Sequence, residues 1–182
     1  MDYYKQELFI PQVNEQDEIK GKVERWKAHQ EGILHRGFTV GVLYDGQMLC
    51  QHRKHPVFDS FLDLTASSHP IYTGDDLQDM TEAVEKCLLR EWSIKPEELS
   101  YKPKLVGKVV YDSRHEDFVE HEVCHLYIAE VKKLPMPVLE FAYGFSLLPL
   151  EQFNDVKKYP LLNGLAPWVE TMIMQDLLKN LT

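Results

Sequence analysis

The feature that most constrains the fold is a long run of alternating side chains at residues 119–131, which predicts a β-strand with two different faces. Residues two apart on a strand point to the same side. Glu120 and Glu122 therefore share a side with two residues that are typical of a core, Cys124 and Leu126. We expect this side, and both carboxylates with it, to face the interior of the protein.

Other periodic segments place this strand among helices and further strands. At residues 75–94, apolar side chains and Glu91 recur at steps of three and four, which predicts a long helix. The irregular segment at 54–74 is too long for an ordinary connection and is expected to be functional or disordered. The remaining predicted elements are a helix at 21–35, strands at 37–44, 47–53 and 105–111, a hairpin turn at Asp45-Gly46, and an amphipathic helix that begins at Pro167. Together they predict helices around a mixed or antiparallel sheet, an α/β (α+β) fold.

Length and charge exclude several classes of protein. A chain of 182 residues, 44% of them hydrophobic, is long enough to bury a core, and we expect residues 1–182 to form a single domain with its core at about residues 33–160. The formal net charge of −9 argues against a nucleic-acid-binding surface. The chain contains no run of about 20 apolar residues and no secretory signal, so we expect a cytoplasmic protein that spans no membrane. Its three cysteines are far apart and are expected to be reduced.

Three histidines, His29, His35 and His69, border or lie in predicted loops, where an imidazole can reach a ligand. Taken singly, each of these histidines is more commonly a capping or surface residue. Glu120 and Glu122 would need no functional explanation if they faced solvent. On an inward face, two close carboxylates are costly unless a cation or a raised pKa compensates. Three imidazoles with two carboxylates suit a divalent ion such as Zn²⁺, Mn²⁺ or Mg²⁺, and octahedral geometry favours Mn²⁺ or Mg²⁺.

Four short runs also occur in the order and approximate spacing of a known family. They are AHQEGILHRGF at 28–38, SSHP at 67–70, EHEVC at 120–124 and APW at 166–168. Through these runs, over residues 24–175, the chain resembles the type I isopentenyl-diphosphate isomerases of the Nudix superfamily. The resemblance implies a Nudix fold, in which a mixed sheet is flanked by the Nudix helix and by N- and C-terminal extensions. It also implies one divalent metal held by five side chains, those of His29, His35, His69, Glu120 and Glu122.

The resemblance further implies a second metal and the groups that move protons. Glu91 is at the position of a glutamate that binds Mg²⁺ together with the substrate diphosphate. Glu122 with Tyr111 corresponds to a catalytic pair on one face of the substrate double bond, and Trp168 to an indole that faces a carbocation-like transition state. The cysteine expected on the opposite face is replaced by Ser67, and a hydroxyl does not exchange protons near neutral pH as a thiol does.

Basic residues match the diphosphate-binding positions of the family only in part. Arg25 and Arg53 match two such positions, and Lys54 is a further candidate. Cys87 stands where the family tends to carry an arginine, with Lys86 adjacent to it. The resemblance therefore implies a small-molecule diphosphate substrate bound by Arg25, Arg53, Lys54 and Lys86.

Three functions remain open at this point. The chain is a metal-dependent isomerase that interconverts isopentenyl and dimethylallyl diphosphate, a Nudix hydrolase of a diphosphate-linked substrate, or a non-catalytic module that binds a metal or a diphosphate. The five metal-binding positions and Trp168 favour the isomerase. The loss of the cysteine favours the hydrolase, but the usual Nudix helix pattern REUxEE is reduced here to KCLLRE at 86–91, where only the last glutamate remains. The residues alone decide neither the metal nor the oligomeric state.

Overall fold

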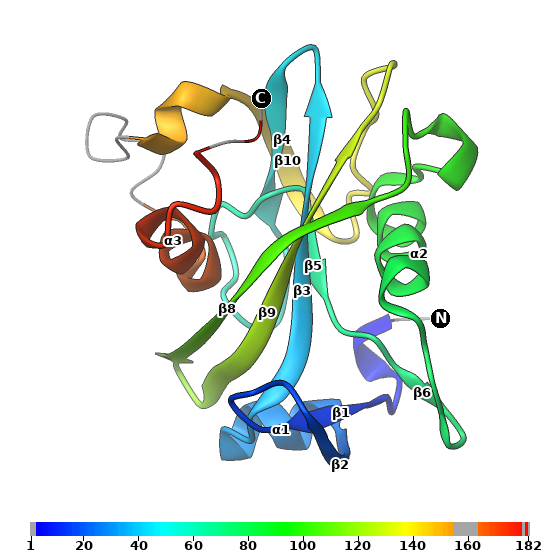
Figure 1. Cartoon of the computed structure of the whole chain (residues 1–182), viewed down its shortest axis with the longest axis vertical. Coiled ribbons are helices and arrows are strands. Elements are labelled where there is room, and N and C mark those ends of the chain that lie inside the picture. The colour runs from blue at the N-terminus through cyan, green and yellow to red at the C-terminus, as the bar shows by residue number, and fades with distance from the viewer. Residues whose placement is uncertain (1–2, 155–163, 180, 182) are drawn as a thin grey trace.

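A computed structural model describes residues 3–154, 164–179 and 181, which form a twisted mixed sheet with helices on both faces (Figure 1). The strands are β1 (Phe9–Val13), β2 (Ile19–Glu24), β3 (His35–Tyr44), β4 (Gln47–Arg53), β5 (Ala66–Ser68), β6 (Tyr72–Thr73), β7 (Asp76–Leu77), β8 (Lys104–His115), β9 (Phe118–Glu130) and β10 (Ala142–Pro149). The helices are α1 (Arg25–Glu31), α2 (Met80–Trp92) and α3 (Pro167–Met174), with 3-10 turns η1 (Tyr3–Lys5), η2 (Pro96–Glu98) and η3 (Leu150–Asn154).

Strand β3 organises the sheet. It pairs antiparallel with β1, β4 and β5, and parallel with β9, so the sheet is mixed as predicted. On one side of β3, β8 pairs with β9. On the other side, β10 pairs with β4, and β2 pairs with β1. The two short strands β6 and β7 form a separate hairpin before α2. This arrangement confirms the predicted fold class.

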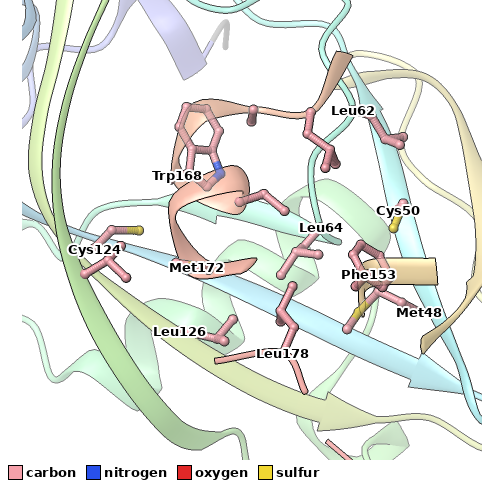
Figure 2. Packing of buried hydrophobic residues seen from close by; sticks show 14 of the residues in the cluster. Met48, Cys50, Leu62, Leu64, Cys124, Leu126, Phe153, Trp168, Met172 and Leu178 are labelled. Carbon is pink, nitrogen blue, oxygen red and sulfur yellow. The ribbon is translucent and has the colours of Figure 1, made fainter. Parts of the chain in front are cut away.

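Buried apolar side chains fill both faces of the sheet, because α2 and α3 cover opposite faces (Figure 1). On the α2 face, Val84, Leu88 and Trp92 pack in one cluster with Phe38 and Val40 of β3. On the α3 face, Trp168 and Met172 belong to a second cluster that includes Cys124 and Leu126 of β9 (Figure 2). In the described residues, no helix is long and apolar enough to span a bilayer.

The predicted boundaries are correct for β4 and need correction at the N-terminal helix. Residues 21–24 belong to β2, and α1 covers only Arg25–Glu31. The helix ends early because Gly32 adopts a left-handed conformation with φ of 64°, which lets the chain turn into β3 at His35. The predicted helix at 75–94 was also too long, since Asp79 caps it and α2 begins at Met80.

Among the described residues, six strands had no counterpart in the prediction: β1, β2, β5, β6, β7 and β10. The segment expected to be irregular, 54–74, contains β5 and β6. Strands β1 and β10 were missed as well. Strand β10 is partly buried along most of its length rather than alternating between buried and exposed positions, so its sequence carries no period-two signal.

Candidate metal centre and its cavity

Four predicted metal ligands converge in the structure: His29 from α1, His35 at the start of β3, His69 directly after β5, and Glu122 from β9. One ligand atom from each side chain lies within 4.8 Å of the corresponding atoms of the other three. The centroids of the three imidazole rings are 4.8 to 5.2 Å apart. Residues that are distant in the sequence therefore form one compact group of donors.

The pairing of β3, β9 and β8 places several of these side chains next to each other. In the parallel pair β3 and β9, His35 is opposite Glu122, and in the antiparallel pair β8 and β9, Tyr111 is opposite the same glutamate. Gly37 leaves room for the Glu122 side chain, because a Cβ atom at position 37 would lie 2.5 to 2.7 Å from its carboxylate atoms. The register of the sheet and one glycine thus position the carboxylate.

Backbone carbonyls orient two of the imidazoles. His29 Nδ1 donates to the carbonyl of Arg25 at 2.6 Å, and His35 Nδ1 donates to the carbonyl of Ile33 at 2.7 Å. A proton on Nδ1 leaves the Nε2 lone pair free to bind a metal, as in metal-binding histidines generally. His35 Nε2 is buried without a hydrogen-bond partner in the described residues, 3.3 Å from Glu122 Oε1. The donor set therefore fits a divalent cation.

Glu120, the fifth predicted ligand, lies beside this group. Its Oε1 is 3.3 Å from His29 Nε2, and its side chain is buried, but it is not among the four residues whose donor atoms lie within 4.8 Å of one another. Burial disfavours protonation of His29, yet the adjacent Glu120 carboxylate raises the pKa of His29 to about 9. Glu120 thus supplies negative charge to the group.

Electrostatics in the cluster favour an ionised Glu122 and a neutral His69. Burial opposes ionisation of Glu122, but the adjacent imidazoles of His35 and His69 hold its pKa well below the usual value. Burial is the largest influence on His69 and lowers its pKa to about 4, although Glu122 Oε1 lies only 2.7 Å from its Nε2. An anionic carboxylate beside a neutral imidazole is the state in which both groups coordinate metals.

The other predicted site residues line a small cavity of about 30 Å³ next to the cluster. Tyr111 donates its hydroxyl to Glu122 Oε2 at 2.8 Å, and burial raises the pKa of this phenol well above its usual value. Ser67 lies on β5, and its hydroxyl is 2.8 Å from that of Thr39 on β3. Trp168 and Glu91 also line the cavity. The catalytic positions that the resemblance implies therefore surround one space.

The structure separates the four predicted basic residues into two groups. Arg25 and Arg53 are buried and line the cavity. Lys54 donates to the carbonyl of Leu139 and is exposed, and Lys86 pairs with Glu82 on the outer side of α2. The side chains of Lys54 and Lys86 are therefore not brought to the cavity.

Sequence reasoning missed two charged residues that contact the lining of the cavity, Asp63 and Arg90. Asp63 is completely buried, accepts a hydrogen bond from Trp168 Nε1 at 2.8 Å, and forms an ion pair with Arg53 at 2.8 Å. It lies in the segment expected to be irregular, where no motif marked it. Arg90 donates to Glu91 Oε1 at 2.7 Å. It lies one helical turn after Cys87, the position where the family tends to carry an arginine, and on the same helix face. This spacing could have identified Arg90 from the sequence.

Comparisons with known proteins agree with the resemblance. No family model matches the chain. It is 25% identical over 151 residues to an isopentenyl-diphosphate Delta-isomerase of Serratia proteamaculans, covering 79% of this chain and 77% of that protein. It is 31% identical over 120 residues to an isopentenyl-diphosphate Delta-isomerase of Burkholderia multivorans, covering 64% of this chain and 63% of that protein.

Solved structures show the same fold at lower sequence identity. The chain is similar to DR0079 of Deinococcus radiodurans, with a TM-score of 0.66 and 15% identity over 92% of this chain and 98% of that chain. It is also similar to a MutT Nudix hydrolase of Burkholderia pseudomallei, with a TM-score of 0.56 and 19% identity over 82% of this chain and 98% of that chain. At these identities the likeness establishes the fold.

Proposed function

The chain is an isopentenyl-diphosphate-isomerase-like protein of the Nudix fold, and from this premise we propose that it interconverts isopentenyl and dimethylallyl diphosphate in a metal-dependent reaction. The observation that carries the proposal is the position of Glu122. Its carboxylate belongs at once to the three-histidine cluster and to a hydrogen bond with Tyr111. One carboxylate thus connects a cation site with a group that transfers protons.

The cation would be held by His29, His35, His69 and Glu122, with Glu120 supplying further negative charge from beside His29. Mn²⁺, Mg²⁺ and Zn²⁺ all accept such nitrogen and carboxylate donors. When bound, a divalent ion supplies positive charge that lowers the pKa of groups in contact with it.

The protein side chains account for the two proton transfers that the isomerisation needs. One proton is added to the double bond and another is removed from the neighbouring carbon, so the composition of the molecule does not change. We assign one transfer to the pair Glu122 and Tyr111, and the other to Ser67 across the cavity. Trp168 lines the same cavity and offers a π face to the positive charge that develops in between.

A second magnesium site would form only with the substrate. Glu91 lines the cavity, and Mg²⁺ commonly binds one or two carboxylates together with substrate phosphates. Arg25 and Arg53 line the same cavity and provide positive charge for a small diphosphate. The net charge of −9 remains unfavourable for a nucleic-acid partner.

Ser67 is the observation that favours a second candidate, hydrolysis of a diphosphate-linked substrate. Because a hydroxyl is a far weaker acid than a thiol, proton transfer through Ser67 alone is slow. Hydrolysis needs no group at that position, since water attacks the phosphorus. The carboxylates of α2 argue against hydrolysis. Glu82 is exposed and pairs with Lys86, so Glu91 is the buried carboxylate of this helix.

Exchange of allylic protons with deuterated water tests the proposal directly. Manganese-loaded wild type, Ser67→Cys and Ser68→Cys are incubated with isopentenyl diphosphate and followed by NMR and phosphate release. We expect slow exchange in the wild type and at least about tenfold faster exchange in Ser67→Cys, because a thiol has a usable pKa. Ser68→Cys is the matched control and should show no increase.

Absence of exchange in both wild type and Ser67→Cys, with metal bound, would contradict the isomerase proposal. Phosphate release from this substrate or from a panel of nucleoside diphosphates would support hydrolysis instead. A raised melting temperature with neither product would indicate a binding module, since a ligand that binds only the folded state stabilises it.

A further inference from the structure

A tyrosine from the N-terminal turn η1 lines the cavity and contacts two arginines, Arg25 and Arg90. The Cζ atom of Arg25 is 4.9 Å from the ring centroid of Tyr3, and the Cζ atom of Arg90 is 4.0 Å from it. The Tyr3 hydroxyl is 3.4 Å from Ser68 Oγ, and Tyr3 itself lines the cavity. An uncharged aromatic ring thus occupies the space toward which two cationic side chains converge.

Both guanidinium groups retain unused hydrogen-bond donors. The Nε atoms of Arg25 and Arg90 are buried and have no hydrogen-bond partner among the described residues. Arg25 is 4% exposed, so solvent does not satisfy its Nε atom either. Buried unpaired donors are costly and are rare in folded proteins. Two of them, on arginines that both contact Tyr3 of the cavity lining, indicate a ligand that accepts hydrogen bonds.

Among the described residues, Arg90 forms an ion pair with one carboxylate, that of Glu91, and all of its side-chain hydrogen bonds use one nitrogen, Nη2. Its Nη2 donates to Glu91 Oε1 at 2.7 Å and to Ser68 Oγ at 3.2 Å. One face of the guanidinium lies on the Tyr3 ring instead of on a carboxylate. Arg25 uses its Nη2 for the backbone carbonyls of η1 and the following loop, which are uncharged acceptors.

The size of the cavity requires a rearrangement before any diphosphate binds. About 30 Å³ is far below the roughly 300–1,000 Å³ of pockets that hold small organic ligands. Tyr3 is the large side chain of the cavity lining that both guanidinium groups contact. Because η1 is a single short turn, moving it disrupts none of the paired strands of the sheet.

We propose that Arg90 and Arg25 together bind the diphosphate group of the substrate, and that Tyr3 occupies their shared space until the substrate displaces it. Arg90, rather than the exposed Lys86, is then the anion-binding residue of α2. Arginine suits this role because its planar fork of donors matches phosphate oxygens in pairs. This proposal depends on the proposed function in one respect, that the ligand is a diphosphate.

Binding of inorganic pyrophosphate, measured by calorimetry with Mg²⁺ on the manganese-loaded protein, tests this assignment. We expect Arg90→Gln to weaken binding at least tenfold. Arg114→Gln, which removes the same charge from an exposed position of β8, should change binding less than twofold. Tyr3→Ala should strengthen binding about threefold or more, because the ring no longer has to be displaced.

Arg90→Lys keeps a positive charge beside Glu91 and guards against misfolding of Arg90→Gln. It should weaken pyrophosphate binding at least threefold, since a point charge replaces the fork. Wild-type affinity in either folded Arg90 variant, or a larger loss in Lys86→Gln than in Arg90→Gln, would overturn the proposal. So would the absence of binding to both wild type and Tyr3→Ala. Arg90-dependent pyrophosphate binding without allylic proton exchange would refute the proposed isomerase while leaving this site in place.

Discussion

Replacing Gly37 with alanine tests whether the sheet itself builds the metal centre. A Cβ atom at this position would lie 2.5 Å from Glu122 Oε1, whereas ordinary contacts begin near 3.4 Å, so the carboxylate must move by about 0.9 Å. The backbone at Gly37 is held by the parallel pairing of β3 with β9, so it moves less than the Glu122 side chain does. We therefore expect Glu122 to leave its position.

The cost follows from what Glu122 contacts. A shift of that size breaks the 2.8 Å hydrogen bond from Tyr111 and moves the carboxylate away from the imidazoles. Metal sites tolerate displacements of roughly 0.5 Å, so we expect metal affinity to fall about 10- to 100-fold, which corresponds to about 1.4–2.8 kcal/mol. Overpacking should also lower the free energy of unfolding by about 1–3 kcal/mol without metal.

The assay combines calorimetric titration with Mn²⁺ and urea unfolding in the presence of a chelator. Gly144→Ala on β10 is the matched control, because an added Cβ there would meet no atom within 4 Å. This control should bind Mn²⁺ like the wild type and keep or slightly raise stability. A Gly37→Ala protein with wild-type Mn²⁺ affinity would refute the argument that Glu122 is a ligand placed by this glycine.

Three further changes probe other parts of the structure. Glu91→Gln should weaken diphosphate-dependent Mg²⁺ binding about tenfold, yet leave Mn²⁺ binding at the histidines intact; unchanged calorimetry with Mg²⁺ and pyrophosphate would count against a role for Glu91. Trp168→Phe should lower the free energy of unfolding by about 1–3 kcal/mol, because buried Asp63 loses its indole donor at 2.8 Å; an unaltered urea midpoint would contradict this. Asp17→Asn should cost about 1–3 kcal/mol at pH 7. Burial raises the pKa of Asp17, but hydrogen bonds from Arg36 and His125 outweigh burial and lower the pKa. The ionised Asp17 therefore contributes to the free energy of unfolding above the unfolded pKa near 3.8. This contribution is lost as the pH falls through the lower folded pKa. The difference between the two proteins in urea unfolding should therefore be constant above the unfolded pKa near 3.8 and shrink as the pH falls below it. A difference that does not shrink below that pH would show that the charge of Asp17 is not responsible.

Local patterns were sufficient where one strand or helix decides the structure by itself. The period-two pattern at 119–131 predicted β9 to within a residue at each end, and the Asp45-Gly46 turn predicted the hairpin between β3 and β4. Pro167 marked the first turn of α3. Side-chain periodicity is a local property, so a single sequence is enough to reveal it.

Local patterns failed where neighbouring strands decide the structure. Residues 21–24 have no strong strand pattern, and they form β2 because β1 lies beside them. Strand β10 likewise depends on its pairing with β4. The stabilisation of such strands comes from cross-strand contacts and from burial, which propensity does not record.

The sequence by itself determined the types of ligand and their family resemblance: three imidazoles, the Glu120 and Glu122 pair, and serine in place of a cysteine at position 67. Only the tertiary structure decided which donors meet, because the register of β3 with β9 brings His35 to Glu122 across a long separation in the chain. It also placed Arg90 against Tyr3 of the cavity lining and Lys86 against Glu82 on the outer side of the helix, although both are on α2. The physical reason is that the direction of a side chain on a helix follows from local geometry, whereas the space it enters is made by distant elements packed around it.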